Sequence, residues 1–250
     1  MYNPFSLEGK NILVTGASSG IGRAIAIECS KMGANVIITA RSKTRLNETL
    51  SMMEASSSHK VIEADLSKAE DINTLTENLS IKLDGIVHCA GFTIIKPFQH
   101  FKEEDINGIM AVNFYAPLYL TKSLLKKKLI NKESSIVFIS SIAGVYNTTL
   151  GNSIYSASKG AINGLMKGIA LELATKSIRV NSINPGMVNT DILSSGIITE
   201  EQLKKDEKKY PLKRYGKPEE IAYGAIYLLS DASKWITGLN LLIDGGITLL

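Results

Sequence analysis

Short and almost continuously apolar runs alternate along the chain with longer stretches in which apolar residues recur at helical spacing. A parallel strand covered on both faces needs apolar residues at nearly every position, so the short runs predict such strands. These runs are NILVTG (11–16), NVIITA (35–40), KVIEAD (60–65), GIVHCA (85–90), SIVFIS (135–140), RVNSIN (179–184) and NLLIDG (240–245). The amphipathic stretches predict helices at 20–32, 103–127, 155–176 and 217–230.

Seven strands that alternate with helices predict the α/β class: one doubly wound, Rossmann-type domain with a seven-stranded parallel sheet flanked by helices. No linker, low-complexity tract or internal repeat divides the chain, so residues 1–250 are expected to form this single domain. The longest irregular segment, about 187–216, follows the carboxyl end of the sixth strand. Ligands bind at that edge in open α/β sheets, so we expect this segment to be a substrate lid.

Composition narrows the class of protein. The 250 residues are 44% apolar and 21% charged, which is enough apolar sequence for a substantial core. The net charge of +4, with no basic stripe among aromatics, argues against nucleic acid as a partner. Cys29 and Cys89 form no evident disulfide framework or metal cluster, and no run approaches membrane length. A soluble cytoplasmic protein without a metal is therefore expected.

The stretch VTGASSGIGRA joins the first predicted strand to the first predicted helix and contains Gly16, Gly20 and Gly22. Glycine permits a tight turn there and lets a pyrophosphate approach the backbone N–H groups of a helix N-terminus. The spacing G-x-x-x-G-x-G differs from the commoner G-x-G-x-x-G fingerprint, but its position after the first strand predicts a dinucleotide site. The same loop places Ser18, Ser19 and Ile21 among the expected cofactor contacts.

The end of the second strand indicates which dinucleotide binds. An NAD site usually has an Asp or Glu there, whereas an Arg accommodates the 2′-phosphate of NADP. The chain has Ala40 in place of the acid, followed by Arg41, and Ser42 adds a hydroxyl donor. These residues predict NADP(H), although Arg41 is also compatible with an ordinary exposed arginine. Asp65 is expected either to accept a hydrogen bond from the adenine amino group or to cap the next helix.

The stretch SIYSASKGAING places Tyr155 four residues before Lys159, so both side chains project from one helix face. A cation about 4 Å from the phenol, at an effective dielectric of about 20, favours the phenolate by ~4 kcal/mol. That energy would lower the phenol pKa by about 3. The pair is therefore predicted to exchange a proton near neutral pH, as a general acid or base must.

Six motifs together resemble the short-chain dehydrogenases/reductases: TGASSGIG (15–22), VN (112–113), ISSIAG (139–144), YSASK (155–159), NPGMVNT (184–190) and DGG (244–246). The resemblance implies that Tyr155 donates a proton to a substrate carbonyl and that Lys159 lowers its pKa and holds the nicotinamide ribose. It implies that Ser141 hydrogen-bonds the carbonyl and that Asn113 holds a water linking Lys159 to solvent. It implies further cofactor contacts at Leu66, Ala90, Gly91, Pro185, Gly186, Val188 and Thr190.

Two features depart from the family pattern. His88 and Cys89 stand where the family often has two asparagines. We interpret His88 as a hydrogen-bonded structural residue rather than a second acid, and Cys89 as a packed residue rather than a reactive thiol. Ser141 and Tyr155 are fourteen positions apart, one more than is usual in the favoured subgroup. The longer loop is expected to place Tyr146 in the substrate pocket wall.

Among family members, the chain is most similar in pattern to the 3-oxoacyl-[acyl carrier protein] reductases of fatty acid biosynthesis. Lys132 and Lys176 stand where that group often carries basic residues for an acidic acyl carrier protein, and are otherwise surface lysines. Sugar, polyol or other small-ketone reductases of the same family are the alternative, and a non-catalytic nucleotide-binding regulator is a more distant one. The resemblance also implies a homotetramer, built from small residues on the Tyr155 helix and the apolar tail LLIDGGITLL.

Overall fold

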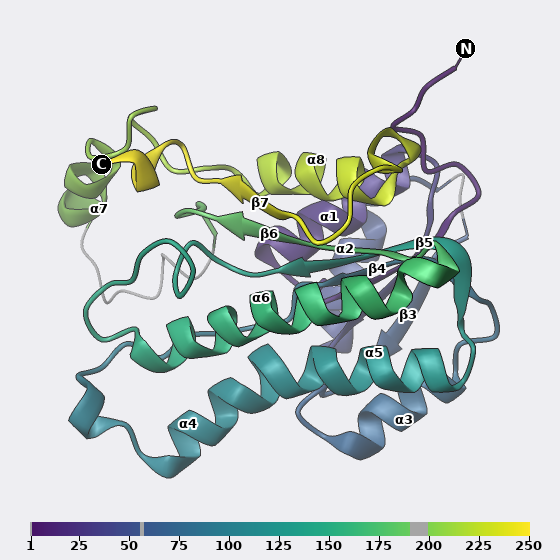
Figure 1. The fold of residues 1–250 in the computed structure, drawn as a ribbon, viewed down its shortest axis with the longest axis horizontal. Coiled ribbons are helices and arrows are strands. Elements are labelled where there is room, and N and C mark those ends of the chain that lie inside the picture. The colour runs from purple at the N-terminus through teal and green to yellow at the C-terminus, as the bar shows by residue number, and fades with distance from the viewer. Residues whose placement is uncertain (1, 56–57, 191–199) are drawn as a thin grey trace.

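The computed structural model describes residues 2–55, 58–190 and 200–250, which form a seven-stranded sheet between two layers of helices (Figure 1). Each neighbouring pair of strands is parallel, and the order across the sheet is β3-β2-β1-β4-β5-β6-β7. The predicted fold class is thereby confirmed. The strands are β1 (Asn11–Thr15), β2 (Asn35–Ala40), β3 (Lys60–Glu63), β4 (Leu83–His88), β5 (Ile130–Ile139), β6 (Arg179–Pro185) and β7 (Asn240–Ile243).

Apolar side chains of the sheet pack into two cores, one on each face. Along β1, Ile12 and Val14 point into one core and Leu13 into the other, as the alternation of strand side chains requires. The first core is closed by α1 (Gly20–Lys31), α2 (Lys43–Ser51) and α8 (Pro218–Leu229). The second is closed by α3 (Ala69–Glu77), α5 (Ala116–Lys126) and α6 (Ser153–Leu173).

One helical run contains a turn of a different kind. α4 (Glu103–Met110) and α5 are joined without a break by a π-helical turn, Ala111–Tyr115. Such turns are rare and occur frequently at functional sites. The run matches the helix predicted over 103–127, but the apolar periodicity gives no sign of the π-helical turn, which contains Asn113.

Three helices in the described part of the chain lie outside the ranges predicted from the amphipathic pattern. α2 and α3 have nine residues each, and α7 (Glu200–Glu207) has eight. α2 buries only Leu46 and Thr49, so its apolar face is too short to give a clear helical period. The remaining short helical turns are Phe98–His100, Ala174–Lys176, Asp231–Ser233 and Ile247–Leu249.

The segment after β6 is anchored at both of its described ends. The Asn189 N–H donates to the Gly216 carbonyl at 2.8 Å, and the Gly216 N–H donates to the Met187 carbonyl at 3.0 Å. The Met187 N–H donates to the Tyr210 hydroxyl at 3.2 Å. The lid predicted over about 187–216 therefore has a fixed base, and its residues 191–199 lie outside the described residues.

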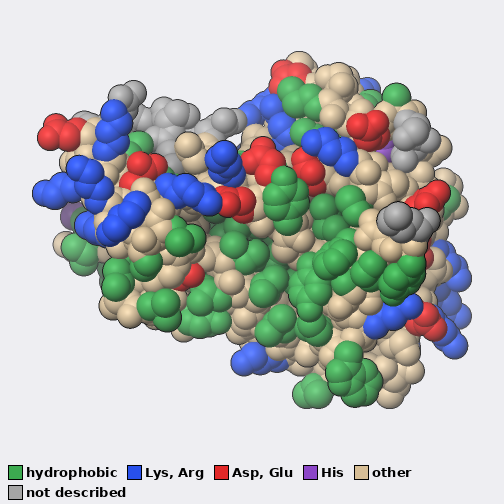
Figure 2. All heavy atoms as spheres, turned by 90° about the horizontal axis from the view of Figure 1, so that it is seen from above, with side chains coloured by type: hydrophobic (Ala, Val, Ile, Leu, Met, Phe, Trp, Pro, Cys, Tyr) green, Lys and Arg blue, Asp and Glu red, His purple; other side chains and the backbone are tan. Residues whose placement is uncertain are grey.

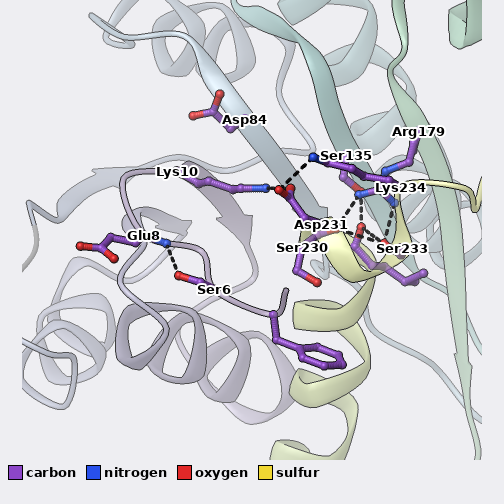
Figure 3. A network of polar contacts seen from close by, with 12 residues as sticks. Ser6, Glu8, Lys10, Asp84, Ser135, Arg179, Ser230, Asp231, Ser233 and Lys234 are labelled. Carbon is purple, nitrogen blue, oxygen red and sulfur yellow. Dashed lines mark hydrogen bonds and ion pairs between the residues drawn. The ribbon is translucent and has the colours of Figure 1, made fainter. Parts of the chain in front are cut away.

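A buried arginine ties the amino end of β6 to the turn that follows α8 (Figure 3). Arg179, 9% exposed, donates to the Ser233 hydroxyl at 2.8 Å and to the Ser230 carbonyl at 3.2 Å. Lys10, just before β1, forms an ion pair of 2.8 Å with Asp231 in the same turn. These contacts join distant parts of the chain at the amino ends of the strands.

Hydrophobic side chains gather on the face formed by α8 and the edge strand β7, whereas lysines and arginines gather towards α7 (Figure 2). Tyr223 on α8 is 56% exposed, and Trp235, which follows α8 after a short turn, is fully exposed. Exposed apolar surface beside an edge strand is typical of a protein–protein contact. No helix in the described ranges is long and apolar enough to cross a bilayer.

Candidate active site

The glycine loop lies between the end of β1 and the start of α1, packed closely on the neighbouring backbone. A Cβ atom at Gly16 would lie 2.8 Å from the Ala90 backbone, and one at Gly22 would overlap the Gly16 carbonyl. Gly16 and Gly20 have φ of 68° and 51°, which favours glycine. The N-cap residue Ser19 makes no side-chain cap, and the first turn of α1 carries no acidic residue. The loop therefore fits a pyrophosphate at the helix N-terminus.

The far end of the predicted cofactor site lies at the ends of β2 and β3. Arg41 is exposed directly after β2, and its charge reaches Asp65. Burial alone would raise the pKa of Asp65, but hydrogen bonds from Ser67 and the charge of Arg41 hold it below its usual value. The Ser42 hydroxyl accepts from the Arg45 N–H at 3.4 Å and so caps α2. The end of β2 therefore presents the cation of Arg41 and has no carboxylate of its own, a combination that fits a 2′-phosphate.

The segment that follows β6 lies against the glycine loop. A Cβ atom at Gly20 would lie 3.2 Å from the Thr190 side chain, which places Thr190 directly beside the loop. Val188 pairs with Gly216 in an isolated bridge, and Gly186 packs against Asp244. The sequence-predicted cofactor residues from 16–22 and from 185–190 are therefore brought together at the carboxyl edge of the sheet.

Lys159 lies buried between α6 and the end of β5. Its Nζ donates to the Ile139 carbonyl at 2.9 Å, and its side chain is 5% exposed. Burial lowers the pKa of this ammonium to about 8. A Cβ atom at Gly91 would lie 3.4 Å from Nζ, so the backbone at Gly91 packs directly beside the ammonium.

Tyr155 and Ser141 form a hydrogen-bonded pair at the amino end of α6. Burial raises the pKa of the Tyr155 phenol, and the hydrogen bond with Ser141 opposes that rise only partly. The Lys159 Nζ lies 5.6 Å from the centroid of the Tyr155 ring. The net effect of the surroundings is thus a raised pKa of the phenol, with burial as the largest cause, and the lowering by Lys159 that the sequence suggested stays a prediction. The phenol is protonated at neutral pH, which is the state that a proton donor needs.

Asn113 connects the helix of the π-helical turn to the segment after β4. Its Oδ1 accepts from the Phe92 N–H at 3.0 Å, and its Nδ2 donates to the Phe92 carbonyl at 2.9 Å and to the Ser158 hydroxyl at 3.1 Å. Asn113 is 1% exposed, so these bonds are buried. The side chain thus fixes residues 91–92 against α6, a positional role that the sequence did not indicate.

Two positioning residues were missed by the sequence analysis. Asn163, one turn after Lys159, donates to the Ser140 hydroxyl at 2.7 Å and accepts from the Ser182 hydroxyl at 2.8 Å. Asn163 thereby hydrogen-bonds α6 to β6 and to Ser140, the residue that follows β5. The Thr15 hydroxyl accepts from the Cys89 N–H at 3.0 Å and from the Ala90 N–H at 3.2 Å. The sequence offered one signal for Asn163, because it is a polar residue on the apolar face of the helix predicted over 155–176.

His88 and Cys89 behave as the sequence analysis proposed. His88 is 5% exposed, hydrogen-bonds Thr121 at 2.9 Å and stacks on Phe138 with the ring centroids 4.9 Å apart. Burial lowers the pKa of His88 to about 3, so it is neutral. Burial raises the pKa of the Cys89 thiol to about 12, against the opposing charge of Lys159. At neutral pH His88 is therefore uncharged and the Cys89 thiol is protonated, as expected of packed structural residues.

Lys132 and Lys176 lie far from this site. Together with Lys82 and Lys128 they line an open groove of about 710 Å³ at the amino ends of β4, β5 and β6. Tyr155 lies at the opposite end of α6, whose 21 residues span roughly 32 Å. Asp84, the acidic residue in the lining, already accepts from Asn131 at 2.7 Å and from the Asn11 N–H at 2.9 Å.

Comparison with known proteins places this site among nucleotide-dependent oxidoreductases. A family model described as "Enoyl-(Acyl carrier protein) reductase" matches residues 16–248. A tropinone reductase homolog of Arabidopsis thaliana is 38% identical, over 97% of this chain and 91% of its own. Glucose 1-dehydrogenase of Gluconobacter oxydans is 36% identical, over 96% and 92%. The 3-oxoacyl-[acyl-carrier-protein] reductase FabG of Rickettsia conorii is 33% identical, over 98% and 99%.

Solved structures show the same fold over the whole chain. The Pseudomonas aeruginosa RhlG/NADP active-site complex has a TM-score of 0.92 and 30% identity, covering 99% of this chain and 100% of that one. A short chain dehydrogenase family protein from Francisella tularensis has a TM-score of 0.84 and 34% identity, covering 96% and 99%. The names of these relatives differ in substrate, so the similarity by itself does not select one.

Proposed function

The chain belongs to the short-chain dehydrogenase/reductase family, and we propose that it is an NADPH-dependent carbonyl reductase. As a member it is an oxidoreductase of alcohol and ketone groups that uses a nicotinamide cofactor. One observation carries the proposal: the protonated Tyr155, hydrogen-bonded to Ser141, lies beside the buried Lys159 at the edge where the glycine loop opens. That arrangement suits proton donation to a ketone oxygen.

The choice of NADPH rests on the end of β2. Arg41 is exposed there, and Ala40 leaves no carboxylate to repel a phosphate dianion. A guanidinium holds a phosphate through two parallel hydrogen bonds. NADP in the related RhlG complex supports the same choice.

The residues of the site divide the work of reduction among them. NADPH, when bound, supplies the hydride. The Ser141 hydroxyl donates to the substrate carbonyl and stabilises the negative charge that develops on its oxygen. The Tyr155 hydroxyl donates its proton to that oxygen, and the Lys159 ammonium stabilises the phenolate that remains. Asn113 keeps residues 91–92 in place beside Lys159.

For the physiological substrate we propose a 3-oxoacyl group on an acidic acyl carrier protein, as the resemblance to FabG proteins suggests. The groove with Lys132 and Lys176 would contact the carrier. Because that groove lies at the far end of α6 from Tyr155, a carrier bound there would deliver its acyl group to the site of another subunit. The apolar face of α8 and β7 supports a homotetramer, which light scattering at micromolar concentration would measure.

Reductase assays test the proposal directly. Purified protein is incubated with NADPH and a panel of 3-oxoacyl thioesters, diketones and keto-sugars, and the loss of NADPH absorbance is followed. We expect steady-state turnover of at least one ketone. Complete absence of turnover across the panel, with NADPH bound, would favour the nucleotide-binding regulator instead.

A further inference from the structure

We infer that the wall of the substrate site selects uncharged ketones, such as keto esters, keto thioesters and alicyclic ketones. It rejects ketones that carry a free carboxylate or phosphate. The inference rests on the proposed function and concerns two loops of the same site. The first, loop A, is residues 91–98 (GFTIIKPF), and the second, loop B, is residues 142–152 (IAGVYNTTLGN).

Both loops lie beside the Ser141–Tyr155 pair. Loop A begins at Gly91, next to the Lys159 ammonium, and runs past the amino end of α6. Its Lys96 N–H donates to the Gly151 carbonyl at 3.1 Å, and a Cβ atom at Gly151 would lie 3.0 Å from the Ile95 side chain. Loop B leads from Ser141 to α6, so it frames the pair from the other side.

Large apolar side chains and a few uncharged polar ones, Asn147, Thr148 and Thr149, make up the exposed part of the two loops. Ile95 and Phe98 of loop A are 53% and 69% exposed, and Val145, Tyr146 and Leu150 of loop B are 37%, 44% and 98% exposed. An exposed apolar surface beside the reacting groups favours a substrate with apolar substituents.

Charge is almost absent from the same wall. Within these 19 residues, eight in loop A and eleven in loop B, Lys96 is the one charged side chain. Its Nζ forms an ion pair of 2.6 Å with Asp105 and is 5.6 Å from the Phe101 ring centroid. The cation is therefore already paired and does not offer a counter-charge to a substrate.

Some polar side chains of the two loops already form hydrogen bonds with each other or with α6. The Thr93 hydroxyl donates to the Asn152 side chain at 2.8 Å, and the Thr148 and Ser156 hydroxyls hydrogen-bond each other at 2.6 Å. These bonds hold the loops on the amino end of α6. A carboxylate that left water to enter this wall would find no unpaired cation within the two loops, and the neighbouring Lys159 ammonium is buried and bonded to the Ile139 carbonyl. Desolvating an unpaired charge is costly.

The test compares two ketones that differ in one charge. Ethyl acetoacetate and the acetoacetate anion share the reacting carbonyl. The ratio of their kcat/KM values with NADPH therefore measures how strongly the wall discriminates against the negative charge. We expect the ester to be preferred by at least about 30-fold, the equivalent of roughly 2 kcal/mol. Equal kcat/KM for the two would overturn the inference while leaving the carbonyl reductase intact. No reduction of any ketone in the wider panel would overturn the proposed function itself, and the inference with it.

A second experiment introduces a positive charge into the wall by substitution. Val145→Lys and Ile95→Lys each place a cation in one of the loops, and each should reduce the preference for the ester at least about fivefold by improving turnover of the anion. Met52→Lys adds the same charge at the exposed end of α2 and should leave the preference unchanged. If both wall variants behave like the Met52→Lys control, the loops do not face the substrate and the inference fails. Circular dichroism checks that each variant is folded.

Discussion

The ammonium of Lys159 donates a hydrogen bond of 2.9 Å to the carbonyl oxygen of Ile139, the last residue of β5. This contact fixes a cation at the carboxyl edge of the sheet while leaving it only 5% exposed. Burial disfavours the charged form and lowers the pKa of Lys159 to about 8, although the neighbouring Cys89 opposes the shift. The site therefore contains a lysine that begins to lose its charge slightly above neutral pH.

This lowered pKa predicts a pH dependence of stability. Between about pH 8 and the usual lysine pKa of 10.5, the unfolded chain holds the Lys159 proton and the folded chain does not. Stability rises with pH wherever the unfolded state binds more protons, so folding gains up to ~3 kcal/mol across this window. Urea unfolding of the wild type and of Lys159→Met at several pH values measures the difference. The raised pKa values of Cys89 and Tyr155 give a slope of the opposite sign in the same window, but both proteins share it, so it cancels in their difference. A difference that stays constant from pH 7.5 to 10.5 would contradict the lowered pKa.

Tyr155→Phe should abolish reduction and leave NADPH binding nearly intact. The ring remains in place, and only the proton donor is removed. General acid–base catalysis contributes roughly 10²- to 10⁴-fold, so the loss should appear in kcat. Lys159→Ala should lower both turnover and cofactor affinity, and Lys159→Arg should recover little. If Tyr155→Phe keeps more than about a tenth of wild-type turnover, the phenol is not the donor.

Arg41→Ala should remove most of the preference for NADPH over NADH. Losing a charge-assisted contact to the 2′-phosphate costs about 1.5–3 kcal/mol, or ~10- to 150-fold in Kd for NADPH. NADH lacks that phosphate, so its Kd should change little. Fluorescence titration measures both, and Lys43→Ala removes one charge from the adjacent start of α2 as a control. Equal affinity of the wild type for NADPH and NADH would refute the cofactor assignment.

Arg179→Ala should destabilise the fold by about 2–4 kcal/mol without changing kcat of the folded protein. The guanidinium donates to Ser233 and to the Ser230 carbonyl in a buried network at the amino ends of the strands (Figure 3). Lys234→Ala is the matched control, because its ion pair of 3.0 Å with Asp231 is exposed to solvent and contributes little to stability. Urea midpoints compare the two variants. Similar losses in both would show that burial of Arg179 adds nothing.

Much of the molecule follows from local sequence. Apolar runs at 11–16, 35–40 and 179–184 gave strands at nearly those positions, because a strand covered on both faces needs apolar residues throughout. The glycine loop and the pair Tyr155–Lys159 could also be read directly, because short motifs at the strand ends carry their own geometry. α2, α3 and α7 could not, because short helices with few buried residues have no clear period.

Only the tertiary structure decided the electrostatics of the site and the position of the outlying lysines. The spacing of Tyr155 and Lys159 indicates a shared helix face, but not the burial that raises the pKa of the phenol. Burial depends on segments far apart in the sequence, such as the Ile139 carbonyl and the backbone at Gly91. Likewise, Lys176 precedes β6 and Lys132 lies at the start of β5, and the parallel sheet places both at the edge opposite Tyr155. Sequence determined which groups the protein has, and the packing of the sheet determined their charge and their neighbours, because desolvation and contact are properties of the folded chain.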